Sequence, residues 1–287
     1  MFKILDKKLL APSIYMMEVE APRLASAAKP GQFLVVRDDE KGERVPLTIS
    51  DFDASKGSVE MVIQTIGAST MKMCEKEPGD AFADVLGPLG CPSEFTAMSD
   101  EQLKSTRFLF IAGGVGAAPV YPQAKYLFQR GARVDVIMGA KSAGMLTYEE
   151  KMSKVCDNLF ICTDDGSKGF HGLVTAKAKE LVAEGRVYDQ AVAIGPMIMM
   201  KFAALTLKEL AIPLTVSLNT LMVDATGMCG ACRVTVGGRT RFACVEGPEF
   251  NAYEVDFDEA MRRQTMYRDI EGHDREDYIE HHKCNIR

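Results

Sequence analysis

Residues 223–245, VDATGMCGACRVTVGGRTRFACV, place four potential metal ligands in the pattern D-x4-C-x2-C-x11-C. The four are Asp224, Cys229, Cys232 and Cys244. Two alternating runs, RVTV and RTRF, flank Gly237-Gly238, and this arrangement is typical of a β-hairpin with a two-residue turn. Such a hairpin would fold the chain back and return Cys244 to the neighbourhood of Cys229 and Cys232.

Three kinds of site fit this pattern to different degrees. Plant-type 2Fe–2S proteins space their ligands C-x4-C-x2-C with a distant fourth cysteine, and this chain fits if Asp224 occupies the first position. A structural zinc site also uses C-x2-C, but it usually adds a second close pair, and none of the four histidines is near. The third alternative is a loop of free thiols. The spacing favours the cluster, with a carboxylate ligand that would alter its potential and lability.

Composition limits the class of protein. The chain has 287 residues, enough for two domains of ordinary size, and 47% of them are hydrophobic. Its net charge of −6 mixes both signs, which argues against a nucleic-acid-binding face. The first residues lack the pattern of a signal peptide, and no apolar run reaches the roughly 18 residues that span a membrane. Eight cysteines without a secretory signal then indicate a cytoplasmic protein.

Residues 1–100 are predicted to form an antiparallel β-barrel. Short alternating segments separated by turn residues are typical of such a barrel. They occur at 13–22, 31–38, 45–53, 58–67 and 80–90. A tight turn, GPLG at 87–90, closes this region.

Two motifs in this region go beyond a plain barrel. The segment RVPLTI at 44–49 contains Pro46, which lacks a backbone donor, so its strand is either a solvated edge or the wall of a site. Farther on, Gly67, Ser69 and Thr70 lie at the start of a short helical pattern. Hydroxyls and free N–H groups at a helix start suit a phosphate, although a simple helix cap uses the same residue types.

Residues 101–218 are predicted to form an α/β domain that binds a nucleotide. The apolar run at 108–112 is typical of a buried parallel strand, and Gly113, Gly114 and Gly116 follow it directly. A helical pattern at 120–130 comes next. In this strand–turn–helix context, the glycines let backbone amides approach a pyrophosphate at the positive end of a helix. A tight turn without a ligand is the alternative.

Four further strands are expected in this domain, separated by helices. The strands are at 133–138, 159–163, 190–194 and 213–217, and the helical patterns are at 142–155, 173–184 and 196–211. This alternation predicts an open, mostly parallel sheet, which binds ligands beyond the carboxyl ends of its strands. Loops carrying Asp164, Asp165 and Gly195 lie at those ends, where the carboxylates either bind a ribose or cap a turn.

The C-terminal part divides into a cluster-binding segment, 219–250, and a tail, 251–287. The spacing of apolar residues in 255–271 is helical, and the rest of the tail is highly charged. A tail this polar is expected to be solvated and mobile, with packing on a partner subunit as the alternative.

The barrel, the α/β domain and the cysteine loop, in this order, resemble the ferredoxin–NADP reductase superfamily. The chain is most similar to electron-transfer subunits of dihydroorotate dehydrogenase and, more closely, to the small alpha subunits of NADH-dependent reduced ferredoxin:NADP oxidoreductase, also called sulfide dehydrogenase beta subunits. The resemblance rests on RVPLTI (44–49), IGAST (66–70), GPLG (87–90), IAGGVGAAPVYPQAK (111–125), TDDGSKGFHG (163–172) and segment 217–250. The oxidoreductase subunits resemble this chain in using Asp at the position of Asp224, where the dihydroorotate type has cysteine.

The resemblance implies FAD in the barrel, NAD(H) on the α/β domain and a 2Fe–2S cluster in the cysteine loop. It assigns barrel-side cofactor contacts to Arg44, Pro46, Leu47, Thr48, Gln64, Gly67, Ser69 and Thr70. It assigns contacts on the α/β side to Gly113, Gly114, Gly116, Ala117, Asp165, Gly195, Pro196 and Met197. The cluster ligands would be Asp224, Cys229, Cys232 and Cys244. No side chain is expected to act as a catalytic acid or base, since the cofactors carry the chemistry.

The resemblance also implies an oxidoreductase subunit with a partner. Electrons would move between NADH or NADPH, FAD and the 2Fe–2S cluster, and then to a larger, glutamate-synthase-like subunit with FAD and 4Fe–4S clusters. That complex couples ferredoxin, NAD and NADP by flavin-based bifurcation. The alternatives are an electron-transfer subunit of dihydroorotate dehydrogenase, a self-contained diaphorase, and a zinc-stabilised nucleotide-binding interaction protein without enzyme activity.

Overall fold

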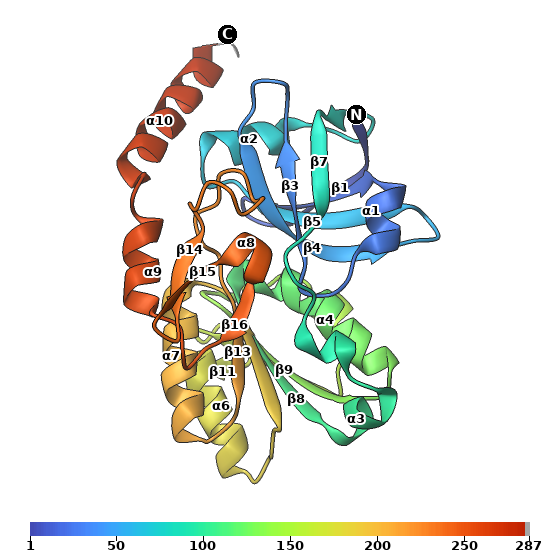
Figure 1. Ribbon diagram of the computed structural model, residues 1–287, viewed down its shortest axis with the longest axis vertical. Helices are drawn as coiled ribbons and strands as arrows, with labels where there is room; N and C mark the ends of the chain where they lie inside the picture. The colour runs from blue at the N-terminus through green and yellow to red at the C-terminus, as the bar shows by residue number, and fades with distance from the viewer. Residues whose placement is uncertain (285–287) are drawn as a thin grey trace.

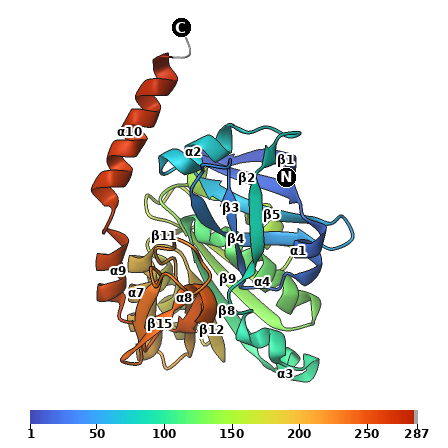
Figure 2. The ribbon, with the colours of Figure 1, turned by 45° about the horizontal axis from the view of Figure 1, so that its top comes forward.

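The computed structural model describes residues 1–284 and contains two seven-stranded sheets, a two-stranded hairpin and a long C-terminal helix (Figures 1 and 2). The expected fold class, an antiparallel β-barrel followed by an open parallel α/β domain, is confirmed. No helix within these residues is long and apolar enough to cross a membrane. Residues 285–287, the end of the predicted tail, lie outside the described residues.

The first sheet is antiparallel and curls into a near-closed barrel with the strand order β6-β1-β2-β5-β4-β3-β7. Its interior is filled by alternate residues of these strands, among them Met17, Ile49 and Met61, which are at most 2% exposed. The strands are β1 (Phe2–Ala11), β2 (Ile14–Glu20), β3 (Phe33–Arg37), β4 (Arg44–Asp53), β5 (Ser58–Gln64), β6 (Ala81–Phe82) and β7 (Asp84–Leu89). The helices of this part are α1 (Pro22–Ala27) and α2 (Ala68–Glu75), whereas α3 (Asp100–Ser105) lies beside β9 of the second sheet (Figure 1).

The second sheet has the order β11-β10-β9-β8-β12-β13-β16 and is parallel except for its last strand. It contains all five strands that the sequence predicts. The strands are β8 (Arg107–Gly113), β9 (Arg133–Ala140), β10 (Asn158–Thr163), β11 (Phe170–His171), β12 (Gln190–Ile194), β13 (Leu214–Ser217) and β16 (Glu249–Asn251). The unpredicted β16 returns from beyond the cysteine loop and pairs antiparallel with β13. At three residues it is too short to show an alternating pattern.

Helices cover both faces of this sheet (Figure 1). They are α4 (Ala117–Gln129), α5 (Glu149–Met152), α6 (Val174–Ala183) and α7 (Met197–Glu209). The single helix predicted at 142–155 is wrong, because only a short 3-10 turn at Ala143–Met145 and α5 are helical there. Between them Tyr148 adopts a left-handed backbone conformation, with φ of 63°, which interrupts a right-handed helix.

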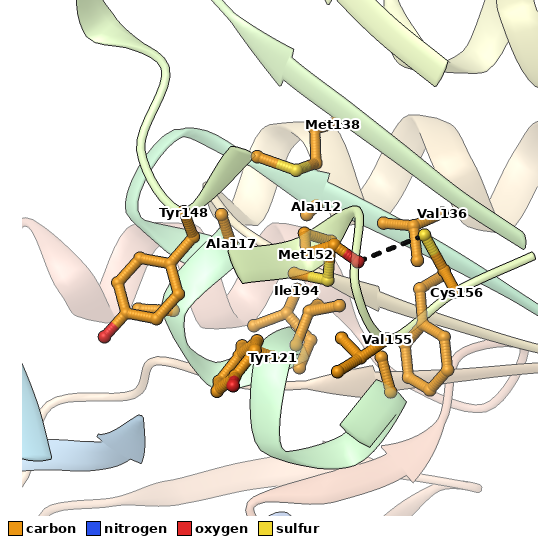
Figure 3. Close-up of a cluster of buried hydrophobic side chains, with 14 of the residues drawn as sticks. Ala112, Ala117, Tyr121, Val136, Met138, Tyr148, Met152, Val155, Cys156 and Ile194 are labelled. Atoms are coloured by element: carbon orange, nitrogen blue, oxygen red, sulfur yellow. Dashed lines mark hydrogen bonds between the residues drawn. The ribbon is translucent and has the colours of Figure 1, made fainter. Parts of the chain in front are cut away.

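Helix α4 joins the two sheets into one core. Its Ala117 and Tyr121 belong to one buried cluster with Ala112, Val136 and Met138 of the parallel sheet, and Figure 3 shows this cluster. The same cluster of buried side chains includes Ile14, Met16 and Val62 of the barrel. Polar contacts reinforce the junction: Lys125 forms an ion pair with Asp51 at 2.8 Å, and the Tyr148 hydroxyl lies 3.1 Å from that of Ser50. The barrel is therefore held at the carboxyl-end side of the sheet.

The predicted hairpin is confirmed, with β14 (Arg233–Val236) paired to β15 (Arg239–Phe242). Gly237 and Gly238 have φ of 59° and 71°, the positive values that a type I′ turn requires. The chain continues through α8 (Ala243–Glu246), β16, α9 (Phe257–Gln264) and α10 (Arg268–Cys284). The charged tail, expected to be mobile, is helical in α10, which extends beyond the body of the molecule (Figure 1). It contacts α2, where the Tyr278 hydroxyl donates to Glu75 at 2.7 Å.

Candidate cofactor sites

A cavity of about 810 Å³ lies where the barrel, the carboxyl ends of the parallel strands and the segment after β13 meet. Its size and largely apolar walls are typical of a cofactor site. Ten of the predicted cofactor contacts line it: Pro46, Leu47, Thr48, Gln64, Thr70, Gly113, Gly114, Gly116, Gly195 and Pro196. Residues predicted from the barrel and from the α/β domain thus converge on one cavity.

The barrel contributes the first part of β4 to this wall. Residues 44–48 pair with β3 on one side, whereas pairing with β5 begins only at Ile49. One edge of this segment is therefore open, and Pro46 is tolerated because no donor is needed there. Pro46, Leu47 and Thr48 lie on the cavity wall.

The start of α2 forms the adjoining part of the wall. The Thr70 hydroxyl accepts hydrogen bonds from the backbone N–H groups of Ile66 and Gly67, at 3.0 and 3.1 Å. It also donates to the Gly67 carbonyl at 2.9 Å, so the turn into the helix is held in one conformation. The N–H groups of the first helical turn have no partner within the helix and can serve an anion.

Close backbone contacts bring the glycine turns of β8 and β12 together. A Cβ atom on Gly116 would lie 2.1 Å from the Ile194 carbonyl oxygen, and one on Gly195 would lie 3.0 Å from that of Gly113. Only glycine permits this approach, which places the β8 turn and the start of α4 beside the β12 turn. Backbone amides and the positive end of the α4 dipole are thereby exposed at the cavity.

Six predicted contacts do not line the cavity: Arg44, Gly67, Ser69, Ala117, Asp165 and Met197. Ala117 and Met197 are 2% and 3% exposed and belong to the core. The Ser69 hydroxyl instead donates to Glu43 at 2.5 Å.

Asp164, rather than Asp165, lies on the cavity wall. The Asp165 carboxylate accepts hydrogen bonds from the backbone N–H and the hydroxyl of Ser167, at 3.0 and 2.6 Å. These hydrogen bonds lower the pKa of Asp165 below its usual range. Asp165 therefore stabilises its own turn, and in this turn it is Asp164 that lies on the cavity wall.

Sequence reasoning missed one wall entirely, the segment that follows β13. Ser217, Leu218, Asn219, Thr220 and Met222 all line the cavity. The Thr220 hydroxyl oxygen is buried and has no hydrogen-bond partner among the described residues. A buried polar atom without a partner is unfavourable, so this hydroxyl fits a polar group of a bound cofactor. The segment has no residue pattern of its own; its position after a parallel strand was the available clue.

The four predicted cluster ligands fall into two pairs beside this segment. The sulfur atoms of Cys232 and Cys244 are 3.2 Å apart and buried, and no disulfide joins them. Asp224 interacts with the more exposed Cys229: the pKa of its carboxyl is lowered by the Thr226 N–H and, more weakly, by the Cys229 thiol. Within residues 1–284, no three such side chains converge on one point that could hold a single metal ion. A 2Fe–2S cluster instead takes two protein ligands on each iron, which fits two pairs.

The loop also supplies hydrogen bonds to its thiols. The Ala231 N–H donates to the Cys229 sulfur at 3.5 Å, and the Cys244 N–H donates to the Cys232 sulfur at 3.4 Å. Gly227 and Gly230 have φ of 85° and 67°, which lets the backbone curl around the ligands. Hydrogen bonds to ligand sulfurs tune the potential of an iron–sulfur cluster.

Comparisons with known proteins place this architecture in a family. Residues 219–256 match the iron–sulfur cluster binding domain of dihydroorotate dehydrogenase B. A protein of Desulforamulus reducens, named dihydroorotate dehydrogenase B (NAD(+)) electron transfer subunit, is 32% identical over 267 residues, with 89% of this chain and 99% of that one covered. The chain belongs to the family of dihydroorotate dehydrogenase B electron transfer subunits and their homologues. This membership confirms the predicted resemblance and the oxidoreductase class.

Within the electron transfer subunit family, other relatives are more similar. A homologue of this subunit from Thermotoga maritima is 42% identical over 269 residues, covering 94% of this chain and 92% of that one. A solved structure of the NADH-dependent reduced ferredoxin-NADP oxidoreductase, described in connection with flavin-based electron bifurcation, superposes with a TM-score of 0.89. It is 41% identical and covers 96% of this chain and 97% of that chain. Phthalate dioxygenase reductase, at 15% identity and a TM-score of 0.56, shares the fold.

Proposed function

We propose that this electron transfer subunit moves electrons between a nicotinamide dinucleotide and a partner, using FAD in the cavity and a 2Fe–2S cluster in the cysteine loop. The observation that carries the proposal is the course of residues 217–224. This segment leaves β13, lines the cavity with Asn219 and Thr220, and ends at Asp224, the first cluster ligand. One stretch of backbone connects the place proposed for the flavin to that proposed for the cluster.

The barrel side of the cavity suits FAD. Thr48, Gln64 and Thr220 add a few polar groups to an apolar wall, as flavin binding requires. Thr70 and the first turn of α2 would hold the pyrophosphate. Arg44, Gly67 and Ser69, which adjoin lining residues in the sequence, would contact parts of FAD outside the cavity. Bound FAD would supply the exchange of electron pairs with nicotinamide and of single electrons with the cluster.

The sheet side of the cavity suits the dinucleotide. Backbone amides of Gly113, Gly114 and Gly116 would approach its pyrophosphate at the start of α4. Gly195 and Pro196 would position the nicotinamide end, and Asp164 would accept hydrogen bonds from a ribose or amide. The chain's part in the reaction is to orient the two rings and exclude water, and no side chain need exchange a proton with them.

The cysteine loop suits a cluster better than a zinc ion. A tetrahedral zinc needs four ligands around one point, whereas within residues 1–284 no three such side chains converge on one point. On this proposal residues 1–100 bind FAD, 101–218 bind NAD(H) and 219–250 bind the cluster.

A larger partner subunit would receive the electrons, as the description of the relatives as electron transfer subunits supports. The 41% identity to the ferredoxin-NADP oxidoreductase favours a partner with FAD and 4Fe–4S clusters that resembles glutamate synthase, in a complex that bifurcates electrons among ferredoxin, NAD and NADP. A dihydroorotate-oxidising partner is the second candidate, favoured by the cluster-domain match and the Desulforamulus relative.

An anaerobic visible spectrum, recorded with iron and acid-labile sulfide analysis before and after addition of NADH, tests the proposal. We expect flavin bands, broader iron–sulfur absorption, about two iron atoms per chain and bleaching by NADH. A colourless preparation with one zinc ion and no flavin would contradict it. Identification of the subunit that copurifies from the native organism separates the two candidate partners.

A further inference from the structure

The last turn of α9 connects the cavity wall to the cysteine loop. The Gln264 side-chain amide donates to the Asn219 carbonyl at 2.6 Å, and the Arg263 guanidinium donates to the Ala231 carbonyl at 2.9 Å. Asn219 lines the cavity, and Ala231 lies between the cluster ligands Cys229 and Cys232. Two adjacent side chains of one helix thus bind the two segments that lead to the two proposed redox centres.

Helix α9 is itself anchored to the α/β domain. Phe257 and Ala260 are 7% and 4% exposed and pack in the same core cluster as α7 and β13. The Asp256 carboxylate caps the helix by accepting from the Glu259 N–H at 2.9 Å. Asp258 at its start forms an ion pair with Lys201 of α7 at 2.6 Å. The helix therefore offers a fixed base from which Arg263 and Gln264 reach the loop.

The loop that these side chains hold is anchored by two buried side chains, Leu218 and Ala225, which are 3% and 2% exposed, but its backbone has little regular support. Residues 218–231 contain no helix or strand, and Val223 and Met228 are 55% and 88% exposed. At the edges of the loop, the Leu218 N–H donates to the Pro248 carbonyl at 2.9 Å. The Arg233 guanidinium donates to the Gly230 carbonyl at the longer distance of 3.3 Å. A guanidinium hydrogen bond is stronger than a neutral one, so we expect that of Arg263 to contribute most to loop order.

We infer that Arg263 and Gln264 are positioning residues for electron transfer, which fix the cysteine loop at a set place relative to the cavity. This inference rests on the proposed function. Neither residue touches the cavity or a ligand sulfur in the described structure, so they would act through the backbone of Asn219 and Ala231. Transfer between two centres depends on their separation, and a loop free to move would vary it.

The chain offers a matched control one residue away. Arg262 has the same side chain on the same helix, but it is exposed and forms no hydrogen bond or ion pair through its guanidinium with any residue that the structure describes. Arg263→Ala and Arg262→Ala each remove one positive charge and make the same change in helix propensity, so a difference between the two variants reports the hydrogen bond of Arg263. Arg263→Lys keeps a cationic donor and tests whether this donor alone restores the order of the loop.

Amide hydrogen exchange of the whole chain, with and without its cofactors, reads the order of the loop directly. We expect Arg263→Ala to accelerate exchange across residues 219–232 about tenfold, as loss of a charge-assisted hydrogen bond implies, with Arg262→Ala unchanged and Arg263→Lys intermediate. In the reduced protein, Arg263→Ala should broaden the electron paramagnetic resonance signal of the cluster. It should also slow cluster reduction after NADH addition, while flavin reduction keeps its rate.

Two outcomes separate the inference from the function on which it rests. If the protein holds about two irons per chain and Arg263→Ala matches Arg262→Ala in exchange, spectrum and cluster reduction, the positioning role is refuted while the proposed function stands. A protein that binds FAD but never a 2Fe–2S cluster refutes the proposed function, and with it the role of these residues in electron transfer.

Discussion

The cavity and the cysteine loop are both suited to cofactors, but the chain holds them in different ways. Most of the cavity wall consists of ends of strands and helices whose other residues fill the core, and glycine contacts such as Gly116 against Ile194 hold them together. Residues 218–222 of the loop complete the wall. The loop from 218 to 231 has no regular structure and exposes Met228. Apart from residues 218–222, the cavity wall is thus fixed by contacts within packed elements, whereas the loop needs ligation to supply part of its order.

The strongest test of this contrast removes the cluster without touching the cavity. Cys232→Ser replaces a buried ligand whose sulfur lies 3.2 Å from that of Cys244. We expect iron to fall from about two atoms per chain to almost none, because a hydroxyl binds iron more weakly than a thiolate. Flavin content and the reduction of flavin by NADH should persist. Iron and sulfide analysis with visible spectra measures both.

Cys91→Ser is the matched control for that experiment. Cys91 is exposed, donates its thiol hydrogen to the Val245 carbonyl at 3.3 Å, and is not one of the four proposed ligands. Its substitution should leave iron content unchanged. Loss of flavin from Cys232→Ser would show that the cavity depends on the loop, and the contrast between the two regions would fail.

A second test attacks the packing of the cavity. Gly116→Ala would place a methyl group 2.1 Å from the Ile194 carbonyl oxygen, a backbone atom that cannot move aside as a flexible side chain could. We expect a loss of about 2–3 kcal/mol in the free energy of unfolding, typical of overpacking, and at least about tenfold weaker NADH binding. Urea unfolding and NADH titration measure the two effects.

Gly114→Ala provides the comparison for this substitution. A Cβ atom at Gly114 meets nothing within 4 Å, but the residue has φ of 55°, which disfavours any other residue type. Only backbone strain of about 1 kcal/mol is expected there. Equal destabilisation by both variants would mean that the close approach of the β8 and β12 turns does not matter.

The same contrast explains how much of the molecule the sequence could reveal. Features set by local patterns were predicted correctly: the Gly237-Gly238 hairpin, the five parallel strands and the glycine turn after β8. Features set by tertiary packing were not. The helix predicted at 142–155 fails at the left-handed Tyr148, and β16 is recognisable only beside β13.

In the candidate site too, residues set by local patterns were easier to predict than residues set by tertiary packing. Gly113 and Thr70, which the sequence predicts as cofactor contacts, both line the cavity, and their turns demand particular residue types. Thr220 was missed because no local pattern marks it, and its orphaned hydroxyl is visible only after folding. The spacing in the sequence predicts the four cluster ligands as a set, but the way in which they pair depends on the path of the loop around Gly227 and Gly230.

A third test concerns Glu249, at the junction that joins the two regions. Its carboxylate accepts hydrogen bonds from the Ser93 hydroxyl and the Gln123 side-chain amide, both at 2.9 Å. These partners come from the connection after the barrel and from α4, while Glu249 belongs to β16 behind the cysteine loop. Burial raises the pKa of Glu249 from 4.5 to about 7, so its ionised form is unfavourable in the folded protein.

The sign of the pH effect follows from this shift. Between pH 4.5 and about 7 the folded state holds a proton that the unfolded state has released, so this group lowers stability as pH rises. Glu249→Gln keeps an acceptor oxygen and removes the charge. Its stability relative to the parent should therefore increase by up to about 3 kcal/mol from pH 4.5 to pH 8. Urea unfolding across this range measures the difference; a constant difference would mean that Glu249 titrates normally.

The prediction with the smallest expected effect concerns two neighbouring carboxylates near the cavity, Asp164 and Asp165. Asp164 lines the cavity, whereas Asp165 is hydrogen-bonded within its own turn to Ser167. Asp164→Asn should raise the KM for NADH about three- to tenfold, as loss of one ligand hydrogen bond implies, with kcat and unfolding unchanged. Asp165→Asn should instead lower stability slightly, because the hydrogen bonds from Ser167 weaken, with a smaller change in KM. The reverse pattern would place Asp165 on the ligand and show that the turn rearranges when the dinucleotide binds, so that packing alone does not fix even this wall.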